Sequence, residues 1–371
     1  MFKRRDAKTF KMDKIINLGI PHIGEQIFES IETEGLIEFL KVSETWKNLA
    51  ENVLIKRWKG KIYEACDRGK TKVVQLLLEH CDADESGLNI KYNHGFTALI
   101  VACHNGRKDV VQLLLNNSES NIDLNARTNQ GCTGLMLACI RGQKDVVKLL
   151  LDDSERNIDL NARCVLGWTA LMCACHMGRT DIVKLLLDSS ERNIDLNARN
   201  NMGWTTFMKA CASGHKDVVQ LFLDNSERII DLNAKNCLGK TAFMIACEYG
   251  HKDVVQLLLD NSERNIDLNA RDNDGDTAFM YACSYGHKDV VQLFLDNSER
   301  NIDLNARNNV GDTALMWACA KGHKDVVQLL LNHSERIELN ARDTIGRTAL
   351  MIARQRGHQE VVQLINSKSN Q

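Results

Sequence analysis

Apolar and polar residues recur along most of the chain with a period of 36 residues. In HKDVVQLLL, residues 323–331, the apolar residues Val326, Val327 and Leu330 follow the i, i+3, i+4 spacing of an amphipathic helix. A shorter apolar stretch, TALMWACAKG, precedes it and ends at Gly322, a typical helix stop. A Gly-x-Thr motif opens each unit, with its threonine at Thr97, Thr133, Thr169, Thr205, Thr241, Thr277, Thr313 and Thr348. The pattern predicts two antiparallel helices and a connecting loop in each unit.

A weaker unit, KIYEACDRGKTKVVQLLLEH from Lys61, precedes these eight and makes nine. The repeated motif, G-x-T-A-L-M-x-A-C-x-x-G-H-x-D-V-V-x-L-L-L followed by D-L-N-A, resembles the ankyrin repeat over residues 59–366. This resemblance implies an all-α fold, an ankyrin-repeat solenoid of about nine helix-turn-helix units. It also implies that the hairpin tips and first helices line a concave surface on which a protein partner binds.

Two features depart from the usual ankyrin pattern. Thr-Ala-Leu-Met replaces Thr-Pro-Leu-His, and the loop LDNSERNIDLNAR makes each unit three residues longer than the family's usual 33 or so. We expect the second helix to gain about one turn through Asn-Ser-Glu-Arg. We expect a left-handed cap at the asparagine that follows, at Asn157, Asn193, Asn265 and Asn301.

Composition and charge narrow the classes of function. The chain has 371 residues and a formal net charge of −2, which gives no reason to expect nucleic-acid or membrane binding. No apolar run approaches the roughly 20 residues of a membrane span, and the basic first residues lack the apolar core of a secretory signal. We therefore expect an intracellular protein, cytoplasmic or nuclear or both, whose thirteen cysteines are free thiols.

The stretch LMCACHMG, residues 171–178, is the strongest candidate for metal chemistry. On a helix that turns about 100° per residue, Cys173, His176 and Met177 share one face and Cys175 points away. Cys175 belongs to a column that recurs once per unit, and packed helices lie about 8–10 Å apart, too far for a disulfide or a shared zinc ion. We expect no metal, no cofactor and no small-molecule ligand. No nucleophile and base pair stands outside the repeat pattern, so we do not expect an enzyme.

The predicted partner-binding site lies where the units differ from one another. Variation concentrates at the hairpin tip, the residue before Thr, the fourth residue after Thr and the two residues before the helix-ending Gly. Every Trp and Tyr after residue 95 falls at such a position, which favours partner contact over core packing. The predicted partner-binding residues are Leu166, Trp168, Cys173, Met177, Met202, Trp204, Leu238, Tyr249, Asp276, Tyr281, Tyr285 and Trp317.

We expect the partner to be an extended protein segment. An apolar anchor would lie against Trp168 and Trp204, next to the apolar tips of the same units. Basic residues further along the segment would face Asp274, Asp276 and Asp312.

Residues 18–58 do not follow the repeat. The stretch IPHIGEQIFESIETEGLIEFLKVSETWKNLA, residues 20–50, resembles an F-box, with Ile20 in place of the usual leucine. The matching positions are Ile20, Pro21, Ile23, Ile27, Phe28, Ile31, Leu36, Val42, Trp46 and Leu49. This resemblance implies that they bind the Skp-family adaptor of a cullin-RING ubiquitin ligase, while the ankyrin array holds the substrate.

An alternative function remains for the same residues. The N-terminal helices would cap the solenoid of an ankyrin scaffold or inhibitor that has no ubiquitin-ligase role. The two hypotheses differ in whether Ile27, Phe28 and Trp46 are covered within the chain or free for an adaptor.

The predicted organisation has four parts. A basic tail covers residues 1–17, the F-box-like segment 18–58, the repeats 59–366 and a polar tail 367–371. In the last unit Arg354 replaces the cysteine of the repeated column, as expected for the polar outer face of a terminal cap.

Overall fold

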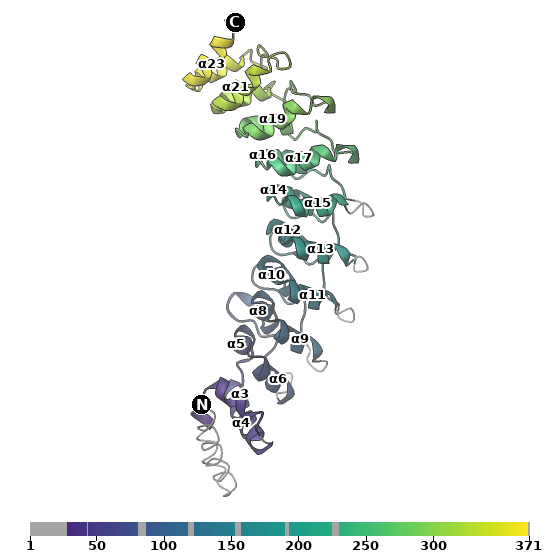
Figure 1. Cartoon of the computed structure of the whole chain (residues 1–371), viewed down its shortest axis with the longest axis vertical. Coiled ribbons are helices and arrows are strands. Elements are labelled where there is room, and N and C mark those ends of the chain that lie inside the picture. The colour runs from purple at the N-terminus through teal and green to yellow at the C-terminus, as the bar shows by residue number, and fades with distance from the viewer. Residues whose placement is uncertain are drawn as a thin grey trace. The chain divides into compact units, whose positions relative to one another are not determined.

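The computed structural model forms two compact units, Met1–Asp159 and Leu160–Gln371, which are described separately. It describes residues 28–42, 44–80, 87–117, 122–152, 157–189, 193–224 and 230–369. In this part of the chain all regular structure is helical and there is no β-strand (Figure 1). The all-α prediction is therefore confirmed.

Unit 1 begins with two helices that precede the repeats, α3 (Thr33–Phe39) and α4 (Glu44–Trp58). Three helix pairs follow: α5 (Ile62–Asp67) with α6 (Thr71–His80), α8 (Ala98–His104) with α9 (Lys108–Asn116), and α10 (Gly134–Arg141) with α11 (Lys144–Asp152). A short 3₁₀ turn, η1 (Asn93–Gly95), lies in the hairpin before α8.

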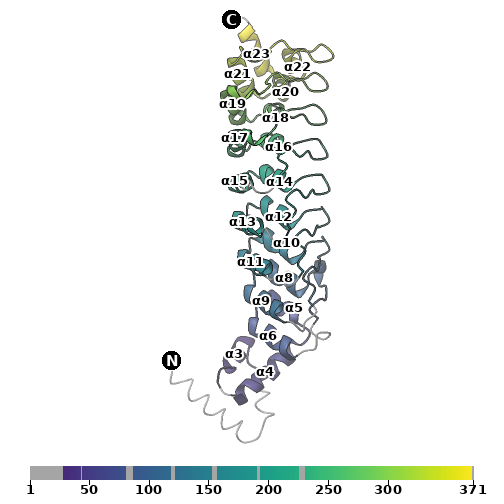
Figure 2. The same ribbon diagram turned by 90° about the vertical axis from the view of Figure 1, so that its right-hand side faces the viewer.

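Unit 2 contains six helix pairs, so the described residues hold the nine pairs that the repeat predicts. The pairs are α12 (Ala170–His176) with α13 (Thr180–Asp188), α14 (Thr206–Ala212) with α15 (Lys216–Asp224), α16 (Ala242–Glu248) with α17 (Lys252–Asp260), α18 (Ala278–Ser284) with α19 (Lys288–Asp296), α20 (Ala314–Lys321) with α21 (Lys324–Asn332), and α22 (Ala349–Gln355) with α23 (Gln359–Ser369). First helices stack in one column and second helices in another, and the hairpin loops lie beside the first column (Figure 2). We name these the inner and outer helices.

The Gly-x-Thr motif starts each inner helix for a physical reason. The Thr277 hydroxyl accepts the backbone N–H of Met280 at 3.4 Å, and every repeat threonine from Thr97 to Thr348 caps its helix in this way. Such caps satisfy N–H groups that a helix leaves unpaired. Gly275 has a φ of 81°, and a Cβ there would lie 2.9 Å from the backbone nitrogen of Asn309 in the next repeat. Only glycine combines this conformation with so close an approach.

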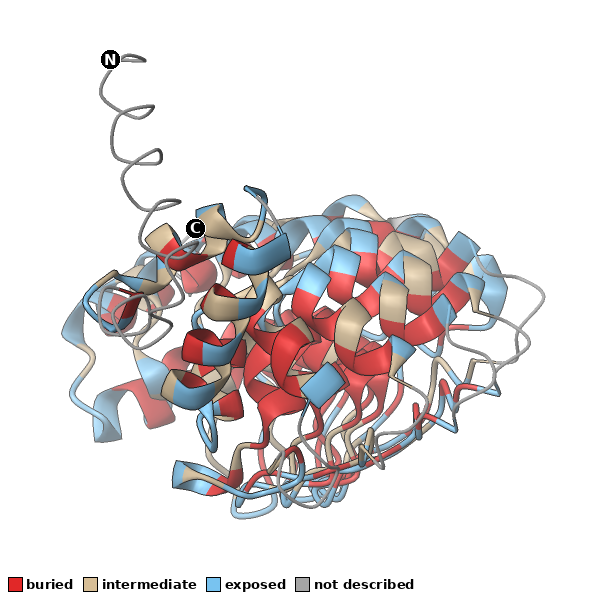
Figure 3. Cartoon of the chain, turned by 90° about the horizontal axis from the view of Figure 1, so that it is seen from below, coloured by how far each residue is buried: buried red, intermediate tan, exposed pale blue. Residues whose placement is uncertain are grey.

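The core lies between the inner and outer helices (Figure 3). The repeated cysteines are fully buried here and act as small apolar side chains. Burial raises the pKa of Cys319 to about 12, so this thiol stays protonated and unreactive. In the described residues no group of three or more His, Cys, Asp or Glu side chains could hold a metal ion.

Histidines and asparagines join each repeat to the next. His251 Nε2 donates to the carbonyl of Ala212 at 2.8 Å, and the histidines of the following repeats do the same. On the opposite loops, Asn269 Oδ1 accepts the N–H of Asp303, and its Nδ2 donates to the carbonyl of Asn301. The asparagine of Asp-Leu-Asn-Ala thus forms a ladder along the unit.

Where the structure describes them, the three extra residues of a repeat form a turn. At η3 (Ser262–Arg264) and η4 (Ser298–Arg300) this turn is 3₁₀, and a non-helical residue separates it from the outer helix. The predicted extra turn is therefore present, but as a separate 3₁₀ turn and not as an extension of the α-helix. Asn193, Asn265 and Asn301 have positive φ values of 51°, 62° and 50°, which confirms the predicted left-handed asparagines at these positions. The fourth, Asn157, is not among the positive-φ residues of the described part, so the prediction is not confirmed there.

The arginine that ends this turn bonds to the preceding repeat. Arg336 Nη1 donates to the carbonyl of Leu295 at 2.7 Å, and Arg264 and Arg300 donate to the equivalent carbonyls. A guanidinium near the end of a helix interacts favourably with its unpaired carbonyls. None of the described helices is both long and apolar enough to cross a membrane.

Candidate protein-binding face

The hairpin tips of unit 2 form an ordered row along the inner helices (Figure 2). Each tip bonds to the one before it: the N–H of Cys237 donates to the carbonyl of Met202, and that of Asn273 to Leu238, both at 3.1 Å. We name the inner helices of unit 2 and its tip residues the tip face. The tip residues are 165–166, 201–202, 237–238, 273–274, 309–310 and 344–345. Among the predicted site residues, Leu166, Met202 and Leu238 lie exposed at the tips.

Trp168 and Trp204 lie on neighbouring repeats, but they do not leave a free apolar pocket. The ammonium group of Lys209 lies between them, 4.3 Å from the ring centroid of Trp168 and 4.1 Å from that of Trp204. Such contacts stabilise a cation over an aromatic face. Burial lowers the pKa of Lys209. One face of each indole therefore already holds this lysine, and the apolar anchor at Trp168 and Trp204 stays a prediction.

The residues of LMCACHMG separate as the helical wheel predicts, with one exception. His176 and Met177 are exposed at the end of α12, and the ring of Trp168 meets His176 edge-on with centroids 5.1 Å apart. Burial and the nearby Lys209 lower the pKa of His176. Cys173 is only 4% exposed, so its predicted place on the contact surface is wrong.

Tyrosines of the next repeats take part in a polar network. Lys240 Nζ lies 4.1 Å from the ring centroid of Tyr281 and donates to both carboxylate oxygens of Glu248 at 2.8 Å. The hydroxyl of Tyr281 donates to Asp272 at 2.5 Å, and that of Tyr285 donates to Glu248 at 3.2 Å. Burial and Asp272 raise the pKa of Tyr281. Tyr281 is therefore partly buried and held in place. Tyr249 and Tyr285 are more exposed, at 53% each.

The Asp276 carboxylate is buried and hydrogen-bonded within the protein. Its residue is 9% exposed, and its Oδ1 accepts the Nδ2 of Asn308 at 2.8 Å and the indole Nε1 of Trp317 at 3.2 Å. Burial raises the pKa of Asp276, and Asp272 adds to that shift. The prediction that Asp276 faces a partner is therefore wrong, since its carboxylate joins two repeats. Trp317 itself is half-buried.

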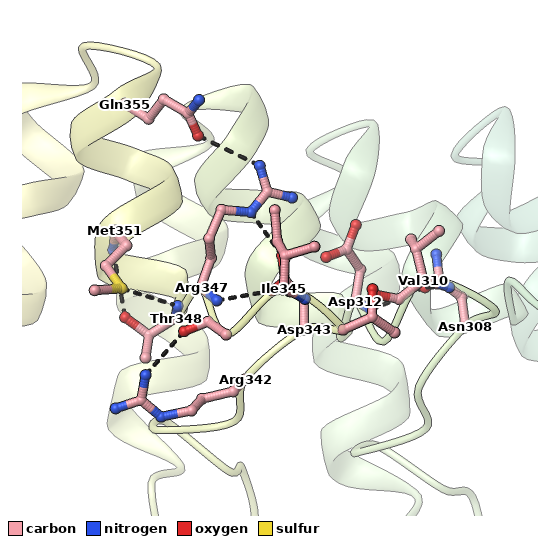
Figure 4. Close-up of polar contacts among 12 residues, drawn as sticks. Asn308, Val310, Asp312, Arg342, Asp343, Ile345, Arg347, Thr348, Met351 and Gln355 are labelled. Atoms are coloured by element: carbon pink, nitrogen blue, oxygen red, sulfur yellow. Dashed lines mark hydrogen bonds and ion pairs between the residues drawn. The ribbon is translucent and has the colours of Figure 1, made fainter.

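One repeat further on, the same position lacks this arrangement. Asp343 takes the place of Asn308, and its carboxylate accepts the Nε of Arg347 at 2.6 Å (Figure 4). Burial would raise the pKa of Asp343, but hydrogen bonds from Arg347 and Ile345 hold it below its usual range. Among described residues, no donor meets the buried Oδ1 of Asp312. Burial, and after it Asp343, raise the pKa of Asp312.

The F-box-like segment forms a small core of its own in unit 1. Phe28, Phe39 and Trp46 pack with ring centroids 5.0 to 5.7 Å apart. Phe28 is fully buried and Trp46 is 2% exposed, and Leu36 is also buried. Because Phe28, Leu36 and Trp46 are buried, they cannot contact an adaptor in this conformation, and the predicted adaptor contact is wrong for these three residues.

The other F-box-like residues differ in exposure. Val42 is exposed, and Ile31 and Leu49 are half-buried. Ile20, Pro21, Ile23 and Ile27 lie outside the described residues. Helix α4 packs against α6, so the first repeat covers part of the segment.

A family model for ankyrin repeats matches residues 62–164, 121–200, 156–236, 227–308 and 300–371. These overlapping matches span far more than half of the chain. The chain belongs to the ankyrin-repeat family. A comparison with curated proteins finds no match. Ankyrin repeats are protein-interaction modules and their proteins are typically non-enzymatic scaffolds. The F-box-like segment lies outside the matched residues.

Lys209 is the member of the tip face that the sequence analysis missed. It is the fourth residue after Thr205, in the same variable column as Cys173, Tyr281 and Trp317. A lysine in a column next to two tryptophans could have predicted a cation–π contact.

Proposed function

We propose that this ankyrin protein is a binding scaffold that holds a protein partner on the tip face of unit 2. One observation carries the proposal: large apolar side chains are exposed at positions where the fold does not need them. The tips at Leu166, Met202 and Leu238 are each more than half exposed, whereas the repeated apolar positions beneath them are buried. Exposed apolar residues gathered on one face are typical of interaction surfaces.

A comparison of two triple variants tests the proposal. The first replaces Leu166, Met202 and Leu238 with serine, and the matched control replaces Gln220, Gln256 and Gln292 of the outer helices with serine. Both should keep the circular dichroism spectrum of the parent. Full burial of one leucine contributes about 1.5–3 kcal/mol, so the tip variant should bind its partners at least tenfold more weakly in quantitative affinity capture. Equal capture by both variants would refute the tip face as the binding site.

The N-terminal helices have a second role in this proposal, as a cap on the first repeat. The burial of Phe28 and Trp46 within unit 1 and the packing of α4 on α6 support a cap. The ubiquitin-ligase hypothesis requires these helices to bind a Skp-family adaptor instead. Calorimetric titration of the whole chain with such an adaptor separates the two roles.

Val42 provides the matched variant for this titration. It is 47% exposed, so Val42→Asp should leave the small aromatic core intact. We expect no adaptor binding by the parent chain. Tight binding that Val42→Asp weakens would overturn the cap and restore the ubiquitin-ligase function.

A further inference from the structure

One column of the tip face carries apolar side chains that the fold does not require. It consists of the second tip residue of each repeat in unit 2: Leu166, Met202, Leu238, Asp274, Val310 and Ile345. The five apolar members are 54% to 73% exposed. Asp274 is exposed at the same position, which shows that a repeat accepts a charge there. Core packing therefore does not explain the five apolar side chains.

The spacing of the column is fixed by the repeats beneath it. The N–H of Asn309 donates to the carbonyl of Asp274, and that of Thr344 to the carbonyl of Val310, both at 3.0 Å. Neighbouring inner helices pack in series, at the usual interaxial distance of about 8–10 Å. The column is therefore a row of side chains with a step of about 8–10 Å.

This step fits one backbone conformation better than others. A polyproline II segment has three residues per turn and rises about 3.1 Å per residue, so every third side chain returns to the same side after about 9.3 Å. A β-strand alternates sides, so its third side chain points away. The tip carbonyls already accept bonds from the next tip, which leaves little backbone for strand addition. A polyproline II segment needs no such bonds.

Charge fixes where along the row a basic residue should lie. Asp272 and Asp276 make hydrogen bonds within the protein, to Tyr281, Asn308 and Trp317. In the described part of the chain, the Asp274 carboxylate has no ion pair, and it stands at the fourth place of six in the row. A lysine or arginine at the matching place of the partner would complement it.

We propose that the tips of unit 2 bind an extended polyproline II segment with an aliphatic residue at every third position and one basic residue opposite Asp274. The segment spans about 16 residues, because six tips are joined by five steps of three residues. This inference rests on the proposed scaffold function and adds the conformation and pattern of the partner.

Synthetic peptides test the pattern by fluorescence anisotropy with the whole chain. The probes are 16 residues long, with leucine at every third position, proline and serine between, and one lysine at position 10 or, for the reverse chain direction, at position 7. The control is a peptide of 21 residues that carries the same five leucines and one lysine in the same order, but at every fourth position, with proline and serine between. A helical peptide of about 36 residues with leucine at every seventh position presents a similar step, about 10.5 Å, on an α-helix. We expect one of the two lysine probes to bind at least tenfold more tightly than both other peptides.

Charge reversal makes the test independent of the overall apolar attraction. Asp274→Lys should weaken binding of the preferred probe at least tenfold, and replacing the lysine of the probe with aspartate should restore it. The inference is wrong if the lysine probes bind no better than the fourth-position control or if the heptad peptide binds best. It is also wrong if charge reversal has no effect. If the serine tip variant loses its partners while no probe binds, the scaffold function stands and the polyproline II pattern fails.

Discussion

Replacing one asparagine of the loop ladder should weaken the coupling between two repeats. Asn269→Ala removes two hydrogen bonds, the 2.9 Å bond from the N–H of Asp303 and the 3.0 Å bond to the carbonyl of Asn301. Each such bond contributes about 0.5–1.5 kcal/mol net. Asn269 is exposed, so water replaces part of both bonds and the lower half of that range applies. We expect a loss of about 1–2 kcal/mol in the free energy of unfolding.

The chain offers both a replicate and a control for this experiment. Asn233 makes the same two bonds, at 2.8 Å to the N–H of Asp267 and 2.6 Å to the carbonyl of Asn265, so Asn233→Ala should cost about as much as Asn269→Ala. Asn340 holds the same position in the last described repeat and makes neither bond there. Asn340→Ala should change stability by less than about 0.5 kcal/mol.

Equilibrium urea unfolding followed by far-UV circular dichroism measures all three variants. The slope of free energy against urea should stay the same, because none of the substitutions changes the surface exposed on unfolding by much. A loss at Asn340→Ala as large as that at Asn269→Ala would refute the ladder as the source of the effect.

Three further predictions follow from the tip face and the N-terminal core. Burial raises the pKa of Asp312, so its ionised form opposes folding, and Asp312→Asn should be more stable than the parent at neutral pH. The difference in urea midpoint between the two proteins should shrink as the pH falls through the folded-state pKa of Asp312. A difference that stays constant with pH would contradict this. Lys209→Met should cost about 1–2 kcal/mol by urea unfolding for two lost cation–π contacts, and the matched Lys321→Met should cost less, because Lys321 lies 5.9 Å from the ring of Trp317. Phe28→Ala should cost about 3–5 kcal/mol within the N-terminal core and speed hydrogen exchange in α3 and α4, with exchange in unit 2 unchanged; protection left intact in α3 and α4 would show that the aromatic core does not hold them.

The repeated part of the fold could be predicted from the sequence because its signals are local. Each inner helix from α8 onward starts at a threonine that caps it within four residues, and the positive φ of the hairpin glycines is a local property of the backbone. The extra turn was predicted for the same reason. Its 3₁₀ form was not, because Arg300 bonds to the outer helix of the preceding repeat and a local pattern does not contain that contact.

The chemistry of the tip face depends on pairs that the period hides. Asp276 meets Asn308 and Trp317, which lie 32 and 41 residues away, and neither separation equals the 36-residue repeat. The sequence therefore indicated where side chains vary, but not which of them bind one another. Cys173 shows the converse limit, since a variable position can still be buried when its side chain is small.

These internal pairs change what a partner would meet on the face. Asp272 and Asp276 share the hairpin of Asp274, yet both direct their carboxylates to hydrogen bonds within the protein. Lys209 and Lys240 likewise hold their charges over aromatic rings of the same chain. A count of charged residues would describe an acidic and basic surface, whereas the geometry leaves an apolar row with the charge of Asp274 in its fourth place. Selection of a partner by this row would therefore depend on one charge and on spacing, which is why reversal of that single charge is the decisive test.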